Sequence, residues 1–456
     1  METGMKKDIM RVFLPNLIKL FVTVLATFFI PRYLNVEEYG YIKVFQLYTS
    51  YIGLSCLGYC EGVFLKHGGQ FLEEIPRKQL ANEQTTLMTW QFVWTIAVSI
   101  VGIVSRDFIT FMVGLSFLPS VMITYFLNFF QSVGSFENYG KLYNTHSILT
   151  IIADIFCLFI IGVSDGKVFV ITTVVINYLV MILVLIIFNR SNKITMGRFE
   201  LARFVENSQL GFLLMLGNMA YILFAGIDKW FVKINMGLTS FSYYSFAVQF
   251  LAAINMFANP IAYTLFSHFS KRKAQDFEYL MKRIMIVGLF FLLSGVFVLK
   301  RIIEMWLVKY TVSIPVLVIL FYGQIFYSLN YAIYINLFKV YHEQKKYFIN
   351  LLLIIVLSIL MNFVFYFFIS ETMLSFAYAT MLCMMLWTFF NLTRFPYLRL
   401  KKKDFLFVVL ASCIYFVANR MESCIGGGIV YILGYSCLLF FFMRDILKML
   451  LKQCKR

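Results

Sequence analysis

The sequence predicts an all-α polytopic membrane protein with about 14 transmembrane helices. Of its 456 residues, 61% are hydrophobic and only 14% are charged, whereas a soluble domain carries roughly 25% charged residues. Most apolar stretches between the polar connectors are about 17–25 residues long, which is the length that crosses the hydrocarbon core of a bilayer. A surface that faces lipid rather than water explains both observations.

Each predicted span is an apolar run that ends at charged or turn-forming residues. We expect the spans at 9–31, 41–64, 85–105, 108–131, 145–164, 167–189, 208–232, 240–266, 283–300, 313–338, 347–369, 373–393, 404–419 and 425–443. The signal is weakest at 283–300 and in the last two spans. Those last two are also compatible with one re-entrant hairpin.

The basic residues alternate between the two sides of this arrangement. Roughly three quarters of the 40 Lys and Arg fall at the amino terminus, in the connectors after even-numbered spans and in the tail, as the positive-inside rule requires of the cytoplasmic side. Both termini are therefore predicted to be cytoplasmic. Topology also explains the net charge of +17, so we expect no nucleic-acid partner.

Several other functions are disfavoured by what the sequence lacks. The eight Cys lie mostly inside apolar stretches without paired CxxC motifs, so neither a metal site nor a disulfide framework is expected. There is no phosphate-binding GxxxxGK[ST] motif, and the longest connectors, at 65–84, 190–207 and 267–282, leave no room for an ATPase module. No catalytic cluster is present. We therefore expect a protein that is not an enzyme and has no cofactor.

Two segments of the sequence resemble each other. Leu34–Gln46 (LNVEEYGYIKVFQ) and Met236–Val248 (MGLTSFSYYSFAV) each join the end of one span to the start of the next. They predict parallel repeats of six spans, although chance similarity between apolar helices is an alternative. The expected domains are 1–197 and 198–396, each a six-helix bundle, and 397–456, which holds two additional helices and a cytoplasmic tail.

Three longer segments carry motifs of a known kind. Leu34–Gly69 has an acidic-Tyr-Gly turn at Glu38–Tyr39–Gly40, then a span with a glycine-rich end and a basic residue, Lys66. Ala225–Gly237 (AGIDKWFVKINMG) has an Asp next to a basic residue, and Asn259–Lys273 (NPIAYTLFSHFSKRK) has a Pro inside a span and a basic exit. This pattern resembles the bacterial polysaccharide (O-antigen or capsule repeat-unit) flippases of the multidrug/oligosaccharidyl-lipid/polysaccharide exporter superfamily.

The resemblance implies two six-helix bundles arranged in a V, with two extra C-terminal helices. It also implies a flippase of the bacterial inner membrane that translocates undecaprenyl-diphosphate-linked oligosaccharide repeat units for surface polysaccharide, such as the O-antigen of lipopolysaccharide, by alternating access. Expected partners are the lipid-linked oligosaccharide and membrane lipids, and also a glycan polymerase and glycosyltransferases. The alternative is a cation-coupled multidrug or small-molecule exporter of the same fold.

Charges inside the spans are the candidate substrate site. A buried charge costs about 2.5–3.5 kcal/mol on insertion scales, so it usually faces water or a partner. Lys19 lies near the midplane of its span, and Lys43 and Lys229 lie nearer the outer side. Because a diphosphate needs counter-charges, these three lysines are predicted to bind substrate. The alternatives are snorkelling of Lys43 and Lys229 and a salt bridge from Lys19 to Asp154.

Two acids are candidates for ion coupling or for charge pairing. Asp154 lies inside the fifth span, and Asp228 lies at the outer end of the seventh. An acid at low dielectric can exchange protons during a transport cycle, or it can simply neutralise a lysine. Polar residues of the tenth span have the same ambiguity, as either a sugar-binding face or packing: Tyr327, Asn330, Tyr331, Tyr334 and Asn336.

Overall fold

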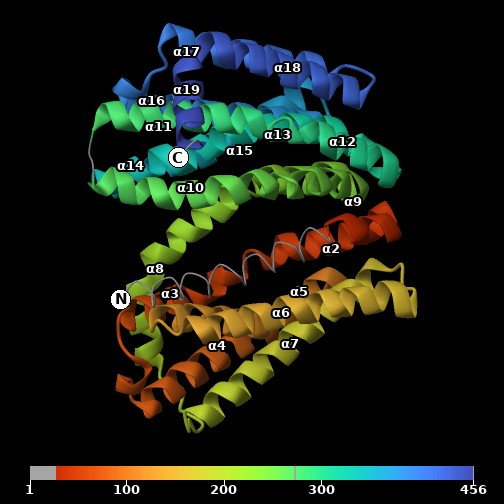
Figure 1. Ribbon diagram of the computed structural model, residues 1–456. Helices are drawn as coiled ribbons and strands as arrows, with labels where there is room; N and C mark the ends of the chain where they lie inside the picture. Colours follow the sequence, from red (N-terminus) through yellow and green to blue (C-terminus); the bar gives the residue numbers. More distant parts are fainter. Residues whose placement is uncertain (1–26, 272–273, 455–456) are drawn as a thin grey trace. The chain divides into compact units, whose positions relative to one another are not determined.

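The computed structural model describes residues 27–271 and 274–454. These residues form helices and connecting segments without any β-strand, as the sequence predicts. The chain divides after Ala225 into two compact units, which we call unit 1 and unit 2. Figure 1 labels their helices.

Unit 1 contains α2 to α8. Their bounds are α2 Val36–Thr49, α3 Tyr59–Lys66, α4 Arg77–Val104, α5 Phe108–Ser132, α6 Phe136–Ile155, α7 Gly166–Ser191 and α8 Leu201–Phe224. Helix α4 packs along α5, α5 packs on α7, and α8 packs on the short α3. Helix α5 is the most buried of the long apolar helices of this unit, so the core of unit 1 forms around it.

Unit 2 contains α9 to α19. Their bounds are α9 Ile227–Gln249, α10 Leu251–Lys271, α11 Gln275–Leu292, α12 Gly295–Trp306, α13 Ile314–Leu329, α14 Ile335–Val340, α15 Gln344–Val364, α16 Met373–Arg394, α17 Lys402–Asn419, α18 Cys424–Phe442 and α19 Arg444–Cys454. Helix α13 packs on α16, and nearly all of its side chains are buried. Helices α17 and α18 lie side by side as a hairpin (Figure 1).

Side-chain caps start several helices at the predicted span edges. Asp107 accepts hydrogen bonds from the amides of Ile109 (3.1 Å) and Thr110 (3.3 Å) at the start of α5. Asp165 accepts one from the amide of Lys167 (2.8 Å) at the start of α7. These first-turn amides have no partner within the helix, so a side-chain oxygen fixes where each helix begins.

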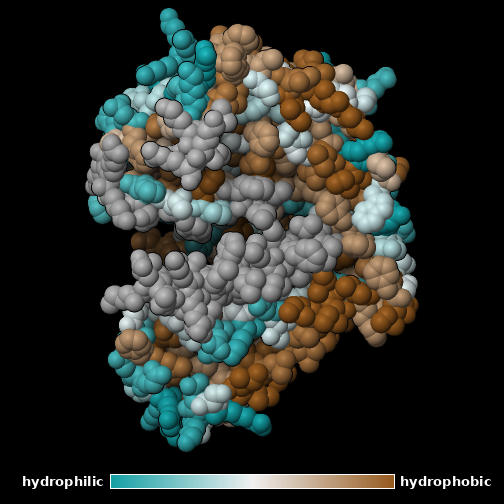
Figure 2. Space-filling model, in the orientation of Figure 1, coloured by the Kyte–Doolittle hydropathy of each residue, from teal (hydrophilic) through white to brown (hydrophobic). Residues whose placement is uncertain are grey.

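The helices are suited to a bilayer. Among the described residues, nine helical segments are long and apolar enough to cross a membrane, or up to ten if α8 and α9 count as one broken span. Many of their large apolar side chains are exposed. Figure 2 shows brown apolar side chains over the flank of α6 and α7, and teal hydrophilic side chains near the helix ends. The protein is therefore a multi-pass membrane protein.

The predicted span at 41–64 is wrong as one continuous helix. Helix α2 ends at Thr49, a 3₁₀ turn covers Ile52–Cys56, and α3 begins at Tyr59. Gly58 has φ +89°, and a Cβ there would lie 2.6 Å from the backbone nitrogen of Phe212 on α8. The chain breaks at this glycine because its backbone touches α8, which hydropathy does not reveal.

Other predicted span edges also move. Helix α6 begins at Phe136, ahead of the predicted 145–164, and it runs into a π-helical segment, Phe156–Ile161. Gly237 (φ +78°) breaks α9 into 227–236 and 238–249, so the predicted span at 240–266 contains the end of α9 and most of α10. The predicted 283–300 contains two helices, α11 and α12. Most of the predicted span at 9–31 lies outside the described residues.

The two similar segments have similar burial. Tyr39 and Phe45 in the first segment are buried, and so are Phe241 and Ala247, which hold the same places in the second. The contact division after Ala225 differs from the predicted boundary at 197/198, because α8 packs on α3. Packing between helices need not follow a repeat boundary, so the ranges 1–197, 198–396 and 397–456 stay a prediction.

Candidate functional site

The three predicted substrate-binding lysines have different surroundings. Lys19 lies outside the described residues. Lys43 on α2 donates a hydrogen bond to Gln46 Oε1 (3.0 Å), and its Nζ lies 5.1 Å from the centroid of the Tyr39 ring. Lys229 is half-buried near the start of α9, and none of the ion pairs found among the described residues includes it. The ammonium groups of Lys43 and Lys229 are thus candidates for an anionic ligand.

Asp228 is buried beside Lys229 in unit 2. Its Oδ2 accepts hydrogen bonds from the hydroxyls of Tyr244 (2.6 Å) and Thr380 (3.4 Å). Its Oδ1 accepts one from the backbone amide of Lys229 (2.8 Å). Two hydroxyls and an amide therefore hold this carboxylate by hydrogen bonds, and it connects α9 to α16. Such a site can bind a cation or a proton, or it can fix the two helices together.

Asp154 lies next to the irregular end of α6. The residue after it, Ile155, is the last of α6, and the π-helical segment Phe156–Ile161 follows. Asp154 is half-buried, and no hydrogen bond or ion pair is found for it among the described residues. Its predicted pairing with Lys19 lies outside those residues. π-Helical segments are frequent at functional sites, so Asp154 remains a candidate for ion coupling.

The polar residues of the tenth span are packed inside unit 2. Asn330 Nδ2 donates to Thr388 Oγ1 (3.0 Å), and Asn336 Nδ2 donates to the carbonyl of Ala262 (2.7 Å). Tyr334 is fully buried, and its hydroxyl accepts a hydrogen bond from Lys282 Nζ (2.8 Å). For Asn330, Tyr334 and Asn336 these contacts match the packing alternative.

Sequence reasoning missed a buried charge cluster in unit 1. We define the Glu83 cluster as Glu83, Lys66, His67 and Arg203. Glu83 on α4 is fully buried, and its Oε2 lies 3.0 Å from His67 Nε2. Its Oε1 lies 3.6 Å from Arg203 Nη1 on α8 and 4.0 Å from Lys66 Nζ. One carboxylate therefore joins α3, α4 and α8.

The protonation of His67 responds to this carboxylate. Burial lowers the pKa of His67, but the hydrogen bond and the negative charge of Glu83 outweigh burial, so the net pKa is raised. The basic residues of this cluster had been explained by topology alone. The only feature of the sequence that pointed to this cluster was an acid, Glu83, within the basic connector at 65–84.

Unit 2 also buries an acid, near the start of α11. We define the Glu278 cluster as Glu278, Tyr341 and Tyr397. The hydroxyl of Tyr341 donates to Glu278 Oε1 (3.0 Å), and that of Tyr397 donates to Oε2. Burial and the hydrogen bond to Glu278 raise the pKa of both tyrosines, which keeps them protonated as donors.

Basic residues next to the Glu278 cluster have their own partners. Lys282 is 2% exposed, and its Nζ donates to the carbonyl of Leu398 (2.8 Å) as well as to Tyr334. Arg283 lies 3.1 Å from the carboxylate of Asp404 on α17 and 2.5 Å from that of Asp445 on α19. These bonds tie the C-terminal helices to α11. Within the described part of the chain, no group of three or more His, Cys, Asp or Glu is placed so that it could hold a metal ion.

No protein-family model and no curated protein sequence matches this chain. Solved structures match it in fold. The lipid II flippase MurJ, in an inward closed conformation, aligns with a TM-score of 0.67 and 17% identity over 96% of this chain and 99% of the flippase. An inward-facing multidrug resistance MATE family transporter of the MOP superfamily aligns with a TM-score of 0.50 and 11% identity over 84% of this chain and 98% of the transporter.

These likenesses establish a shared fold. This chain has the all-α membrane fold of a flippase and of a transporter of the MOP superfamily, which confirms the predicted fold class. Alignment with the flippase leaves little of either chain unmatched, whereas alignment with the MATE transporter leaves a larger part of this chain unmatched. Identities this low carry no substrate with them.

Proposed function

We propose that this protein is a flippase that moves undecaprenyl-diphosphate-linked oligosaccharide repeat units across the bacterial inner membrane by alternating access. The observation that carries the proposal is the nearly end-to-end fold alignment with a lipid II flippase. The repeat units would supply surface polysaccharide, such as the O-antigen of lipopolysaccharide. The protein itself would catalyse no covalent step and would need no cofactor.

The chemistry of such a substrate fits the charges of the spans. A diphosphate loses its hydration in hydrocarbon, so a path across the membrane must replace that hydration with cations or donors. Lys43 and Lys229 are the described lysines that we propose for this role, together with Lys19. Asp154 and Asp228 would couple the cycle to an ion or would balance these lysines.

The location and partners follow from the same proposal. Both termini would be cytoplasmic, since the basic connectors favour that side. Membrane lipids and the lipid-linked oligosaccharide would be direct partners. Glycosyltransferases would act before transport, and a glycan polymerase would act after it.

A multidrug or small-molecule exporter is the second candidate. The buried carboxylate of Asp228, which is held by Tyr244 and Thr380, favours it, because cation-coupled export needs an acid that can bind an ion. The MATE alignment supports the same fold for either function. Efflux of cationic dyes from cells with and without the protein separates the two: a flippase leaves dye efflux unchanged.

The decisive experiment deletes the gene and identifies the lipid-linked intermediate that accumulates. We expect an undecaprenyl-diphosphate oligosaccharide on the cytoplasmic face, together with loss of surface glycan. Unchanged surface glycan, or accumulation on the outer face, would overturn the proposal.

Variants of the proposed lysines then test the site. Lys229→Ala and Lys19→Ala should each lower surface glycan at least tenfold at equal protein level, while the Arg variants should retain part of it. Lys43→Ala should also lower surface glycan, and Lys167→Ala is its matched control. The ammonium groups of Lys43 and Lys167 lie 5.1 Å and 5.2 Å from the centroids of the Tyr39 and Tyr41 rings, but only Lys43 is proposed to bind substrate. Equal glycan in all of these variants would remove the lysines from the mechanism.

A further inference from the structure

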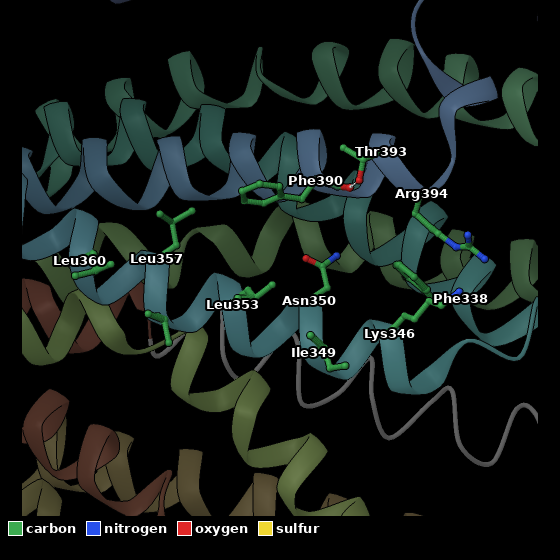
Figure 3. Close-up of a pocket in the computed structure, with 11 residues that line it drawn as sticks. Phe338, Lys346, Ile349, Asn350, Leu353, Leu357, Leu360, Phe390, Thr393 and Arg394 are labelled. Carbon is green, nitrogen blue, oxygen red and sulfur yellow. Dashed lines mark hydrogen bonds between the residues drawn. The ribbon is translucent and has the colours of Figure 1, made fainter.

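An open groove runs along the flank of unit 2 between α15 and α16. Its volume is about 500 Å³, and its apolar lining includes Ile349, Leu353, Leu360 and Phe390. The first three of these side chains are 58%, 62% and 55% exposed. In a membrane protein, exposed apolar side chains on a helix flank face hydrocarbon. We call this feature the α15–α16 groove (Figure 3).

The length of the groove suits one hydrocarbon chain. From Lys346 to Leu360, α15 rises about 21 Å at roughly 1.5 Å per residue, which is more than half of a hydrocarbon core about 30 Å thick. The one amide in this stretch of the lining, Asn350, donates to Asn391 Oδ1 on α16 (2.5 Å). Its polar group therefore serves helix packing, and the rest of the stretch is apolar.

The two ends of the groove differ in charge. Lys346 and Arg394 lie together at one end, and Leu360 lies at the other (Figure 3). Lys346 Nζ lies 3.1 Å from Glu343 Oε1, and Arg394 pairs with the same carboxylate. Two cations thus share one acid, which leaves a net positive charge at the end that belongs to the predicted cytoplasmic side.

Unit 1 has a corresponding groove between α6 and α7, which we call the α6–α7 groove. Its volume is about 160 Å³, and Lys141, Phe188 and Asn192 are among its lining residues. Phe188 and Asn192 hold the places of Phe390 and Arg394 at the same offset that relates the two similar segments of the chain. Lys141 pairs with Glu137 (2.8 Å). This groove is smaller, and Asn192 supplies no second cation.

We infer that the α15–α16 groove binds a bilayer phospholipid with an anionic headgroup. One hydrocarbon chain lies along α15, and the phosphate lies at Lys346 and Arg394. An Arg guanidinium can bind two phosphate oxygens at once, and a Lys adds a point charge. The headgroup of a zwitterionic lipid carries its own cation, which Lys346 and Arg394 repel, so such a lipid should bind more weakly. The groove opens to the bilayer, so its occupant can enter sideways, and the inference does not depend on what the protein transports.

Native mass spectrometry of the full chain in detergent tests the inference with two lipids of equal chain length. Phosphatidylglycerol should bind at least tenfold more tightly than phosphatidylcholine. Lys346→Gln combined with Arg394→Gln should remove this preference. Glu343→Gln should instead strengthen phosphatidylglycerol binding, because it removes the acid that competes with the phosphate. Unchanged preference in the double variant, or weaker binding in Glu343→Gln, would overturn the inference.

Neighbouring residues provide matched controls. Lys345→Gln changes an exposed lysine beside Lys346 that does not line the groove, so lipid preference should stay within about twofold of wild type, the scale of one exposed surface charge. Leu353→Trp should fill the groove and weaken binding of both lipids, whereas Leu352→Trp, at an exposed neighbour outside the lining, should not. Equal effects of the two Trp variants would place the bound lipid elsewhere.

Two further probes identify the source of the phosphate. Inorganic phosphate should not compete with phosphatidylglycerol, because it lacks the chain that the groove holds. Undecaprenyl phosphate should compete only weakly. If it displaces phosphatidylglycerol fully, and the double variant abolishes its binding too, the groove is a substrate site and the assignment to a bilayer phospholipid is wrong.

Discussion

Unit 1 and unit 2 each bury an acid near the amino-terminal end of a long helix, but they surround it differently. The Glu83 cluster places three basic side chains around one carboxylate. The Glu278 cluster instead gives its carboxylate two tyrosine hydroxyls. A buried carboxylate requires hydrogen bonds in either case. The comparison teaches that a buried carboxylate is held by basic side chains in one unit and by neutral hydroxyls in the other.

The grooves of the two units differ in the same way. The α15–α16 groove has two cations for one acid, whereas in the α6–α7 groove one lysine pairs with one acid. The unbalanced cation therefore lies in the groove of unit 2 and not in that of unit 1. Each difference gives an experimental test.

The largest effect is expected from removing the acid of the Glu83 cluster. Glu83→Gln removes the acid partner of the fully buried His67 and leaves Lys66 and Arg203 only their outer partners, Glu206 and Glu200. Breaking a buried ion pair costs about 3–5 kcal/mol. Glu278→Gln removes the negative charge but leaves an amide oxygen that can still accept from the tyrosine hydroxyls, so the free energy of unfolding should fall by only about 1 kcal/mol. Thermal unfolding of the detergent-solubilised variants measures both. Equal losses of stability would break the comparison between the units.

A second effect is expected at the crossing of α3 and α8 in unit 1. Helix α8 touches α3 at Gly211, where a Cβ would lie 2.0 Å from the carbonyl oxygen of Gly58. Gly211→Ala must push the two backbones apart, at a cost of about 1–3 kcal/mol. Gly217→Ala is the control on the same helix, since nothing lies within 4 Å of its Cβ position. It should be neutral or stabilising by up to about 1 kcal/mol, and similar melting temperatures for the two variants would contradict the tight crossing.

The pH dependence of stability gives a smaller effect. The pKa of His67 is raised in the folded protein, so its pairing with Glu83 stabilises fully below the unfolded value of about 6.5. That stability is lost as pH rises through the folded pKa. Melting temperatures of wild type and His67→Gln, measured from about pH 5.5 to about pH 9 around the ordinary histidine value, should diverge most at low pH. Parallel profiles would show that His67 does not titrate in this way.

The smallest effect is expected when the charge pattern of unit 2 is built into unit 1. Asn192→Arg supplies the α6–α7 groove with the cation that it lacks. Binding of phosphatidylglycerol should rise a few-fold over wild type, less than in unit 2 because the groove is smaller. Asn192→Gln is the uncharged control. An increase with Gln as large as that with Arg would rule out charge as the cause.

Most of the fold was predictable because hydropathy acts residue by residue. The apolar runs behind α5, α7, α15 and α16 are long enough that their helices fall where they were predicted, whereas α4 begins eight residues before its predicted span at 85–105. The break at Gly58 was not predictable, since it depends on the backbone of α8, which lies far along the chain. The start of α6 at Phe136 was not predictable either, because the first turns of this helix are polar and hydropathy does not mark them.

The candidate site was only partly predictable. Asp228 and Lys229 were identified because charges are rare in apolar runs. The hydroxyls that hold Asp228 were not, because Tyr244 lies further along α9 and Thr380 lies on α16. Glu278 and Lys282 stand in or next to a basic connector, where charge is ordinary. Nothing local marks either of them as buried.

The sequence by itself determined the class of protein and the approximate positions of most helices. Length, apolarity and charge are sums over neighbouring residues, so they need no knowledge of packing. Tertiary structure alone decided which charges are buried, which acids face cations or hydroxyls, and where a groove opens to lipid. Those outcomes depend on side chains that meet across distant helices, and the free energy of a buried charge is set by the partners it meets there.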